Sequence, residues 1–196
     1  MEQLKIDFDK VIESLKLSSE NINSRKKNFN QFLKNGFPNK RVEDWKFSDL
    51  NQIISSNIEN LRLHSDLELS NIDEKIFIDK FTHNKIVFLN GVISKIDFSQ
   101  EDETKVLLTR NLNQNKNFKE VNPLVSLNNA LAVSYIRVTV KENYSLNEPL
   151  IIYNITTKDL KSTALNFKTD IVLEKNSSLK VINLFDDNSE NNFINI

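Results

Sequence analysis

The sequence predicts an α+β fold in which a helical N-terminal leader precedes a mainly β region. Three observations predict it. Apolar residues recur at helical spacing over the first third of the chain, short apolar runs begin after Lys85, and alternation is clear from Ile136 onward. We expect two parts, a helical N-terminal domain over residues 1–83 and a β-rich region over residues 84–196.

Signals for three helices lie in the leader. The first helix is predicted by apolar residues three or four positions apart, at Leu4, Phe8, Val11, Ile12 and Leu15. A second helix begins after Ser18 and ends at Gly36, which can adopt the left-handed cap conformation, and Pro38 prevents continuation. Ser48 is the expected N-cap of a third, short helix through Ile54.

Strand signals dominate the rest of the chain. Asn90-Gly91, between two short apolar runs, is a strong tight-hairpin signal. Further strands are expected over 106–108, 136–140, 150–155, 167–173 and 179–185, with a polar loop over 111–117 and a short helix introduced by Asn122-Pro123. The spacings reveal no repeat of fixed period. Apolar residues from Phe193 to Ile196 begin one more strand, so we expect the β domain to be truncated there.

Composition excludes several classes of function. Lys plus Arg is 26 and Asp plus Glu is 27, a net charge of −1 that disfavours general nucleic-acid packaging. The chain has no cysteine, so thiolate nucleophiles and cysteine-ligated metal sites are excluded. It has two glycines and 29 asparagines, so we expect asparagine at many turns that need a positive φ. No apolar run of membrane-spanning length occurs, and we expect a soluble, cytoplasmic protein without a membrane partner.

Few residues suggest chemistry, and we assign no catalytic, cofactor-binding or metal-binding residue. Glu43 and Asp44 are adjacent and point apart, which disfavours an acid–base pair. His64 and His83 are expected to be ordinary surface residues, and Arg25-Lys26-Lys27 a solvated basic face. Trp45, the single tryptophan, is expected to pack the leader onto the β region, with a partner-binding anchor as the alternative.

The stretch from Phe32 to Leu50 carries the most specific motif. Gly36-Phe37-Pro38, a basic pair at Lys40-Arg41, acidic residues, and Trp45-Lys46-Phe47-Ser48 resemble the signature near the start of SufD, in the SufB/SufD family. Further blocks follow the family in order, over 85–94, 126–132, 136–140, 148–152 and 169–185, so the resemblance extends from about Ser24 to Phe185. Phe37, Phe47 and Ser48 stand where Leu, Tyr and Thr are usual, and Phe47 therefore lacks the phenol hydroxyl.

The resemblance implies a fold and a role. It implies that the β-rich region is the first part of a right-handed parallel β-helix. It also implies a non-enzymatic scaffold subunit of the SUF iron–sulfur cluster assembly system, acting with a SufB-like subunit and a SufC-like ATPase. The iron–sulfur cluster, held transiently, and a flavin would belong to the complex, because no residue here matches the family's cluster-handling positions.

Two other functions stay open at this point. A β-rich ligand- or carbohydrate-binding module with a helical leader would need exposed aromatic residues on a strand face. Tyr135, Tyr144 and Tyr153 are the available tyrosines. A cupin-like metal enzyme would need several clustered histidines, and the chain has two.

Overall fold

The computed structural model describes residues 2–64, 72–110 and 122–196, and it confirms an α+β fold with a helical leader. The leader contains α1 (Glu2–Ser14), α2 (Ser19–Asn35), η1 (Glu43–Trp45), α3 (Leu50–Asn57) and η2 (Glu74–Ile76). The strands are β1 (Asn84–Leu89), β2 (Val92–Asp97), β3 (Val106–Thr109), β4 (Ser134–Val140), β5 (Leu150–Thr156), β6 (Ala164–Leu173), β7 (Val181–Asp187) and β8 (Phe193–Asn195). Two further helices, α4 (Gln100–Lys105) and α5 (Pro123–Leu131), interrupt them. The polar loop expected over 111–117 lies outside the described residues.

Both ends of α2 are capped as the sequence predicts. The Ser18 side chain accepts a hydrogen bond from the backbone N–H of Asn21. Gly36 has a φ of 67° and donates its N–H to the carbonyl oxygen of Phe32. The helix therefore ends where a residue without a Cβ can take the left-handed conformation.

The N-cap of α3 is Asp49, so the prediction of Ser48 was wrong by one residue. The Asp49 side chain accepts a hydrogen bond from the backbone N–H of Gln52 at 2.9 Å. Both residue types are good N-caps, and sequence alone does not separate two adjacent candidates.

A tight hairpin joins β1 and β2, as predicted. Asn90 and Gly91 have φ values of 48° and 80°, and two positive φ angles are what a two-residue turn of this twist requires. Asparagine fills most other positive-φ positions outside glycine, at Asn60, Asn143, Asn176 and Asn191, beside Ser162. The expectation that asparagine replaces glycine at such turns is confirmed.

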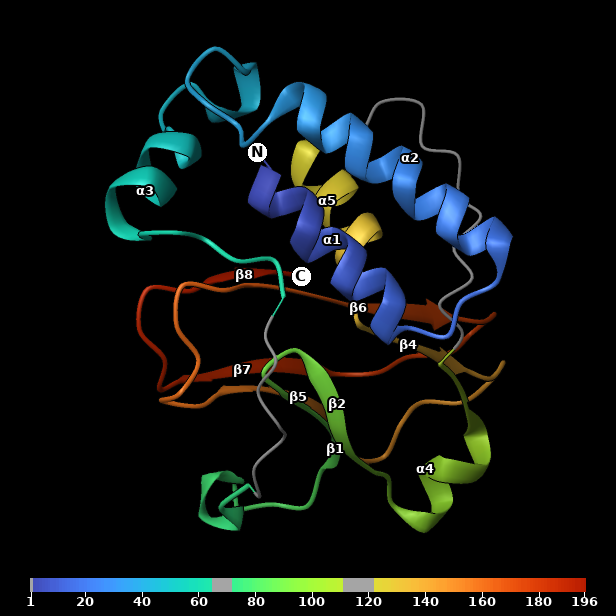
Figure 1. Cartoon of the computed structure of the whole chain (residues 1–196). Coiled ribbons are helices and arrows are strands. Elements are labelled where there is room, and N and C mark those ends of the chain that lie inside the picture. The colour runs from blue at the N-terminus through green and yellow to red at the C-terminus, as the bar shows by residue number, and fades with distance from the viewer. Residues whose placement is uncertain (1, 65–71, 111–121) are drawn as a thin grey trace.

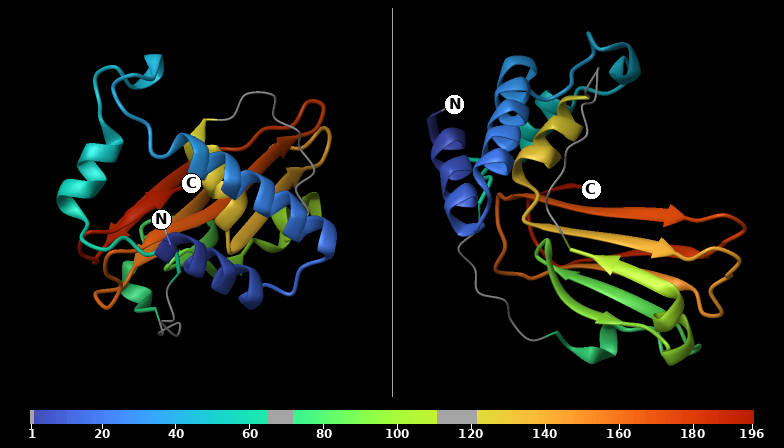
Figure 2. Two further views of the ribbon diagram at one scale, coloured as in Figure 1. Left: turned by 45° about the horizontal axis from the view of Figure 1, so that its top comes forward. Right: turned by 90° about the vertical axis from the view of Figure 1, so that its right-hand side faces the viewer.

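The eight described strands form two four-stranded sheets, with orders β2-β1-β5-β7 and β3-β4-β6-β8. From β4 onward, consecutive strands alternate between the two sheets. All neighbours among β4 to β8 pair in parallel, as does β1 with β5. The antiparallel strands β2 and β3 each occupy one edge. The two sheets lie in layers, with α1, α2, α3 and α5 gathered to one side of them and α4 and η2 at the opposite side (Figure 1 and Figure 2).

The main core lies between the two sheets. Inward-facing side chains from both sheets form one cluster, and the Phe88 ring of β1 stacks on the Phe167 ring of β6 with centroids 4.6 Å apart. Alternate residues of β4, Ile136, Val138 and Val140, are fully buried, as their spacing predicts. A smaller cluster covers the other face of the β1–β5 pair, where residues from the segment 72–78 pack on Val87, Ile151 and Tyr153.

A third cluster joins the helices to the strands. It contains Phe8 and Val11 of α1, Phe29 and Phe32 of α2, Leu127, Ala130 and Leu131 of α5, together with Leu63 and Ala164. Helix α5 comes from the β-rich half of the sequence, yet it packs on α2 in the helical layer (Figure 1). The helical leader is therefore anchored to the strands through α5 and the first residues of β6.

Candidate functional site

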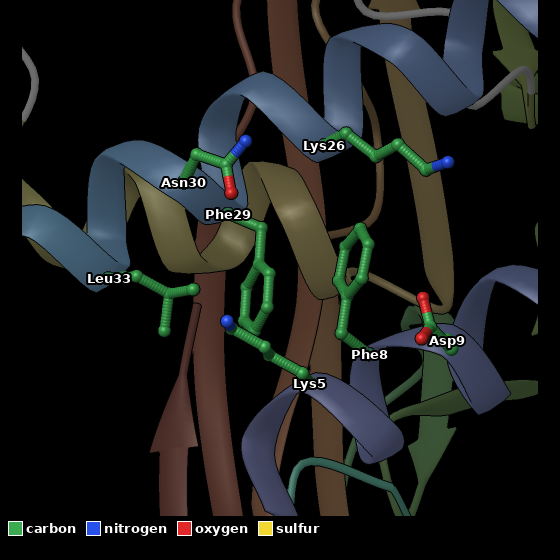
Figure 3. Close-up of a pocket in the computed structure, with 7 residues that line it drawn as sticks. All are labelled: Lys5, Phe8, Asp9, Lys26, Phe29, Asn30 and Leu33. Carbon is green, nitrogen blue, oxygen red and sulfur yellow. The ribbon is translucent and has the colours of Figure 1, made fainter. Parts of the chain in front are cut away.

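The groove between α1 and α2 is lined by seven residues that come from both helices (Figure 3). Its floor is the stacked pair Phe8 and Phe29, whose ring centroids lie 4.2 Å apart with an interplanar angle of 4°. The rim carries the exposed side chains of Lys5, Asp9 and Lys26, one lysine from each helix, and Asn30 and Leu33 complete the lining. The cavity volume is 280 Å³.

The residues of this groove are suited to binding a partner rather than to catalysing a reaction. Its floor is apolar and nearly buried, and its charged groups are flexible lysines and one carboxylate on the solvent side. Covalent catalysis needs a nucleophile held by a base, and the seven lining residues offer no such pair. The groove can hold an apolar group of a partner between two positive charges.

A second cavity, of 300 Å³, lies where α1 meets the hairpin turn and the first residues of β6. Its lining is mostly apolar, and Ser14, His64, Asn90 and Thr163 contribute polar groups. Thr163 and Asn90 already have partners, since the Thr163 hydroxyl donates to Lys161 and the Asn90 amide donates to Thr157. This cavity lies at the interface between the helical layer and the strands, and we call it the junction cavity.

The two histidines lie in different places. His83 Nε2 lies 2.9 Å from the hydroxyl of Tyr153, which also accepts the backbone N–H of Ile78. His64 lines the junction cavity instead. Within the described residues, no group of three or more His, Cys, Asp or Glu side chains is arranged to hold a metal ion. The contact between His83 and buried Tyr153 holds the segment before β1 against β5.

Trp45 does not pack the leader onto the β region, contrary to the expectation from sequence. Its side chain is half-buried in η1, and the cluster that joins helices to strands consists of other residues. The connection between α2 and α3 carries η1 to the part of the helical layer remote from the sheets (Figure 1 and Figure 2). Next to it, Phe47 is 89% exposed, while Glu43 pairs with Lys46 at 3.3 Å.

The three tyrosines do not form an exposed aromatic surface. Tyr135 and Tyr153 are buried, and Tyr144 is half-buried. The Tyr135 hydroxyl donates to Asp170 at 2.8 Å, and Arg137 donates to the same carboxylate oxygen at 2.9 Å. Burial and the bond to Asp170 raise the pKa of Tyr135 to about 12. This cluster ties β4 to β6 and gives no platform for a sugar ring.

Asp102 accepts hydrogen bonds from four different residues. Its side chain, fully buried at the start of α4, accepts hydrogen bonds from the Asn84 amide, the Tyr144 hydroxyl, and the backbone N–H groups of Asn147 and Glu148 at 2.7–3.2 Å. Burial alone would raise the pKa of Asp102, but these four donors outweigh it and lower that pKa. The carboxylate joins α4, the start of β1 and the segment between β4 and β5.

Arg25 is buried, so the prediction of a solvated basic face was wrong at this residue. Its guanidinium donates to the carbonyl oxygens of Ala130 and Ala132, both at 2.9 Å. These carbonyls end α5, where a helix presents unpaired acceptors and negative potential. Burial lowers the pKa of Arg25 to about 10. Lys26 and Lys27 are exposed, as expected.

Asp7, in α1, is likewise a buried charged residue that bonds to a segment distant in sequence. Its buried carboxylate receives two hydrogen bonds from the Nε and one from the Nη2 of Arg62, and it accepts the backbone N–H of Leu63 at 2.8 Å. Burial raises the pKa of Asp7, and the bonds from Arg62 and Leu63 lower it further than burial raises it. A polar residue in an otherwise apolar helix stripe is the sequence signal that marks Asp7.

A scan against protein-family models gives no match to this sequence, and neither does a search of curated proteins. No helix among the described residues combines the length and apolar character needed to cross a bilayer. The resemblance to the SufB/SufD family therefore stays a prediction, which rests on the residues quoted for it.

Proposed function

We propose that this chain is a non-enzymatic scaffold subunit of iron–sulfur cluster assembly, acting with a SufB-like subunit and a SufC-like ATPase. The proposal rests on the order of the family's sequence blocks, from the Gly36 to Ser48 motif to the strands before Phe185. The cluster is the cargo of the assembled complex, and a flavin would belong to the complex as well.

The observation that carries the proposal is the winding of the strands behind a helical leader. Successive strands alternate between two sheets and stack in parallel on the strands of the preceding turn. This is the arrangement expected for the first turns of a parallel β-helix, the fold that the resemblance implies. Right-handed winding is expected, since parallel crossovers of the opposite hand are rare.

Side chains that stack from turn to turn support the same interpretation. The Asn176 amide donates to Asn143, 33 residues earlier, and Ser178 donates to Ser145 across the same interval. The corresponding interval is 31 residues between Thr156 and Asp187. It is 29 residues between the buried amides of Asn166 and Asn195. Intervals this similar are typical of stacked repeats.

Depletion of the chain in its host tests the proposed function. We expect enzymes with labile iron–sulfur clusters to lose activity while their polypeptide amounts stay constant, because cluster supply fails and synthesis does not. Restoring the gene restores activity, and a dehydrogenase without a cluster is the control. Unchanged activity of the cluster enzymes would contradict the proposal.

A further inference from the structure

The junction cavity is an apolar hollow with a volume of 300 Å³. Its walls come from α1, the β1–β2 hairpin, the end of α5 and the start of β6, and no described residue of β7 or β8 lines it. Apolar side chains make up most of the lining, among them Val11, Leu15, Val92, Leu131 and Val133. An apolar cavity of about 150 Å³ already binds benzene, so the junction cavity can hold a larger molecule.

Buried hydrogen bonds hold the helical walls of this cavity in place. The Arg25 guanidinium donates to the carbonyl oxygens of Ala130 and Ala132 at the end of α5, both at 2.9 Å. The Asp7 carboxylate accepts the backbone N–H of Leu63 at 2.8 Å and ties this part of the lining to α1. Neither wall can move into the cavity without breaking a bond to a buried charged group, which is costly.

The walls on the strand side are held in the same way. The Asn90 side chain donates to the Thr157 hydroxyl and accepts the Thr157 backbone N–H, both at 3.0 Å, which fixes the hairpin turn. The Val133 N–H donates to the carbonyl oxygen of Asn166 at 3.1 Å, and the Asn166 side chain accepts the Asn195 amide at 2.9 Å. Because structure around a void relaxes only in part, walls held at these points keep the cavity open.

The lining favours an uncharged ligand. None of the described residues that line the cavity is Lys, Arg, Asp or Glu. Polar side chains in the lining are bonded within the chain, since the Ser14 hydroxyl donates to the carbonyl oxygen of Val11 at 2.8 Å and the Thr163 hydroxyl donates to that of Lys161 at 2.9 Å. A charged ligand would lose its hydration here and find no opposite charge, whereas an apolar ligand would gain contacts with the lining.

We propose that the junction cavity binds a small, uncharged apolar molecule, about the size of two fused aromatic rings. The ligand enters beside Ser14, an exposed residue of the lining at the end of α1. It lies against the side chains of Val11, Leu131 and Val133, in contact with both the helical layer and the strands. This binding does not depend on the proposed scaffold function.

Titration of the full chain with naphthalene, followed by the NMR signals of its methyl groups, tests the proposal. We expect saturable shifts for methyl groups that line the cavity, at Val11, Leu131 and Ala164. The methyl groups of Val138 and Ile152, in the core between the sheets, should not shift. Naphthalene-1-sulfonate carries a charge on the same rings and should bind about tenfold more weakly or less.

A cavity-filling variant tests the position of the ligand. Val133→Phe places a ring in the cavity and should weaken naphthalene binding about tenfold or more, while the circular dichroism spectrum stays unchanged. Val125→Phe, at a 40% exposed position of α5 outside the lining, is the matched control. If Val133→Phe does not fold, the methyl shifts of the unaltered chain decide. The absence of saturable shifts overturns the proposal, as do shifts confined to other methyl groups, equal binding of the sulfonate, or unchanged binding by folded Val133→Phe.

Discussion

Replacing the buried carboxylate of Asp102 by an amide tests how far one polar group holds the β region together. Each oxygen of Asp102 accepts two hydrogen bonds, one pair from Tyr144 and Asn147 and the other from Asn84 and Glu148. In Asp102→Asn, an NH₂ group replaces one oxygen and faces two donors. A buried donor that loses its partner costs about 1–3 kcal/mol, so the free energy of unfolding should fall by about 2–4 kcal/mol.

Urea denaturation followed by circular dichroism measures this change. Tyr144→Phe removes one of the four bonds and should cost about 1 kcal/mol. Glu101→Gln, at the exposed neighbour of Asp102 in α4, is the matched control and should stay within about 0.5 kcal/mol of the unaltered chain. If Asp102→Asn is as stable as the control, the carboxylate is not the anchor that its bonds indicate.

The same variant has a pH signature. The pKa of Asp102 in the folded chain lies below the value of about 3.9 that an unfolded aspartate has. Its ionised form therefore stabilises the fold above that pH, and the contribution is lost as pH falls through the lower, folded pKa. The stability difference between the unaltered chain and Asp102→Asn should be constant from neutral pH to about pH 5 and shrink below about pH 4. A difference that grows in acid would refute the assignment.

Three further predictions concern buried Arg25, half-buried Trp45 and the absence of cysteine. Arg25→Met should lower the free energy of unfolding by about 2 kcal/mol, because the carbonyls of Ala130 and Ala132 lose their donor, while Lys26→Met should change it little. Trp45→Ala should cost less than about 2 kcal/mol in the same assay, below the 3–5 kcal/mol typical of a fully buried aromatic residue. Anaerobic reconstitution with iron and sulfide should leave no stoichiometric iron on the isolated chain, since it has no cysteine, and one retained equivalent would contradict this.

Local signals in the sequence predict the secondary structure well. Ser18 and Gly36 delimit α2, Asn90-Gly91 makes the hairpin, and the alternation from Ile136 gives β4 its buried face. Each of these features depends on a few neighbouring residues, whose preferences act over one turn of helix or one pair of strands. The domain boundary after residue 83 and the parallel β-helix depend on pairing between distant segments, so both stay predictions.

The partners of the buried polar residues could not be predicted, because they are remote in sequence. Arg25 bonds to carbonyls 105 and 107 residues away, and Asp7 bonds to Arg62, 55 residues away. The place of Asp7 in the apolar stripe of its helix indicates burial, but neither it nor Arg25 reveals in the sequence which groups it bonds to. The sequence shows no fixed period, since the hydrogen-bonded polar pairs on neighbouring strands or turns are 33, 31 and 29 residues apart.

Affinity purification of the tagged chain from its host, followed by native mass spectrometry, tests the proposed scaffold role most directly. We expect complexes whose masses equal the chain plus a SufB-like subunit and a SufC-like ATPase, with both partners identified by their peptides. A purification that yields the chain without either partner, at natural expression levels and with a known complex recovered in parallel, would contradict the proposed function.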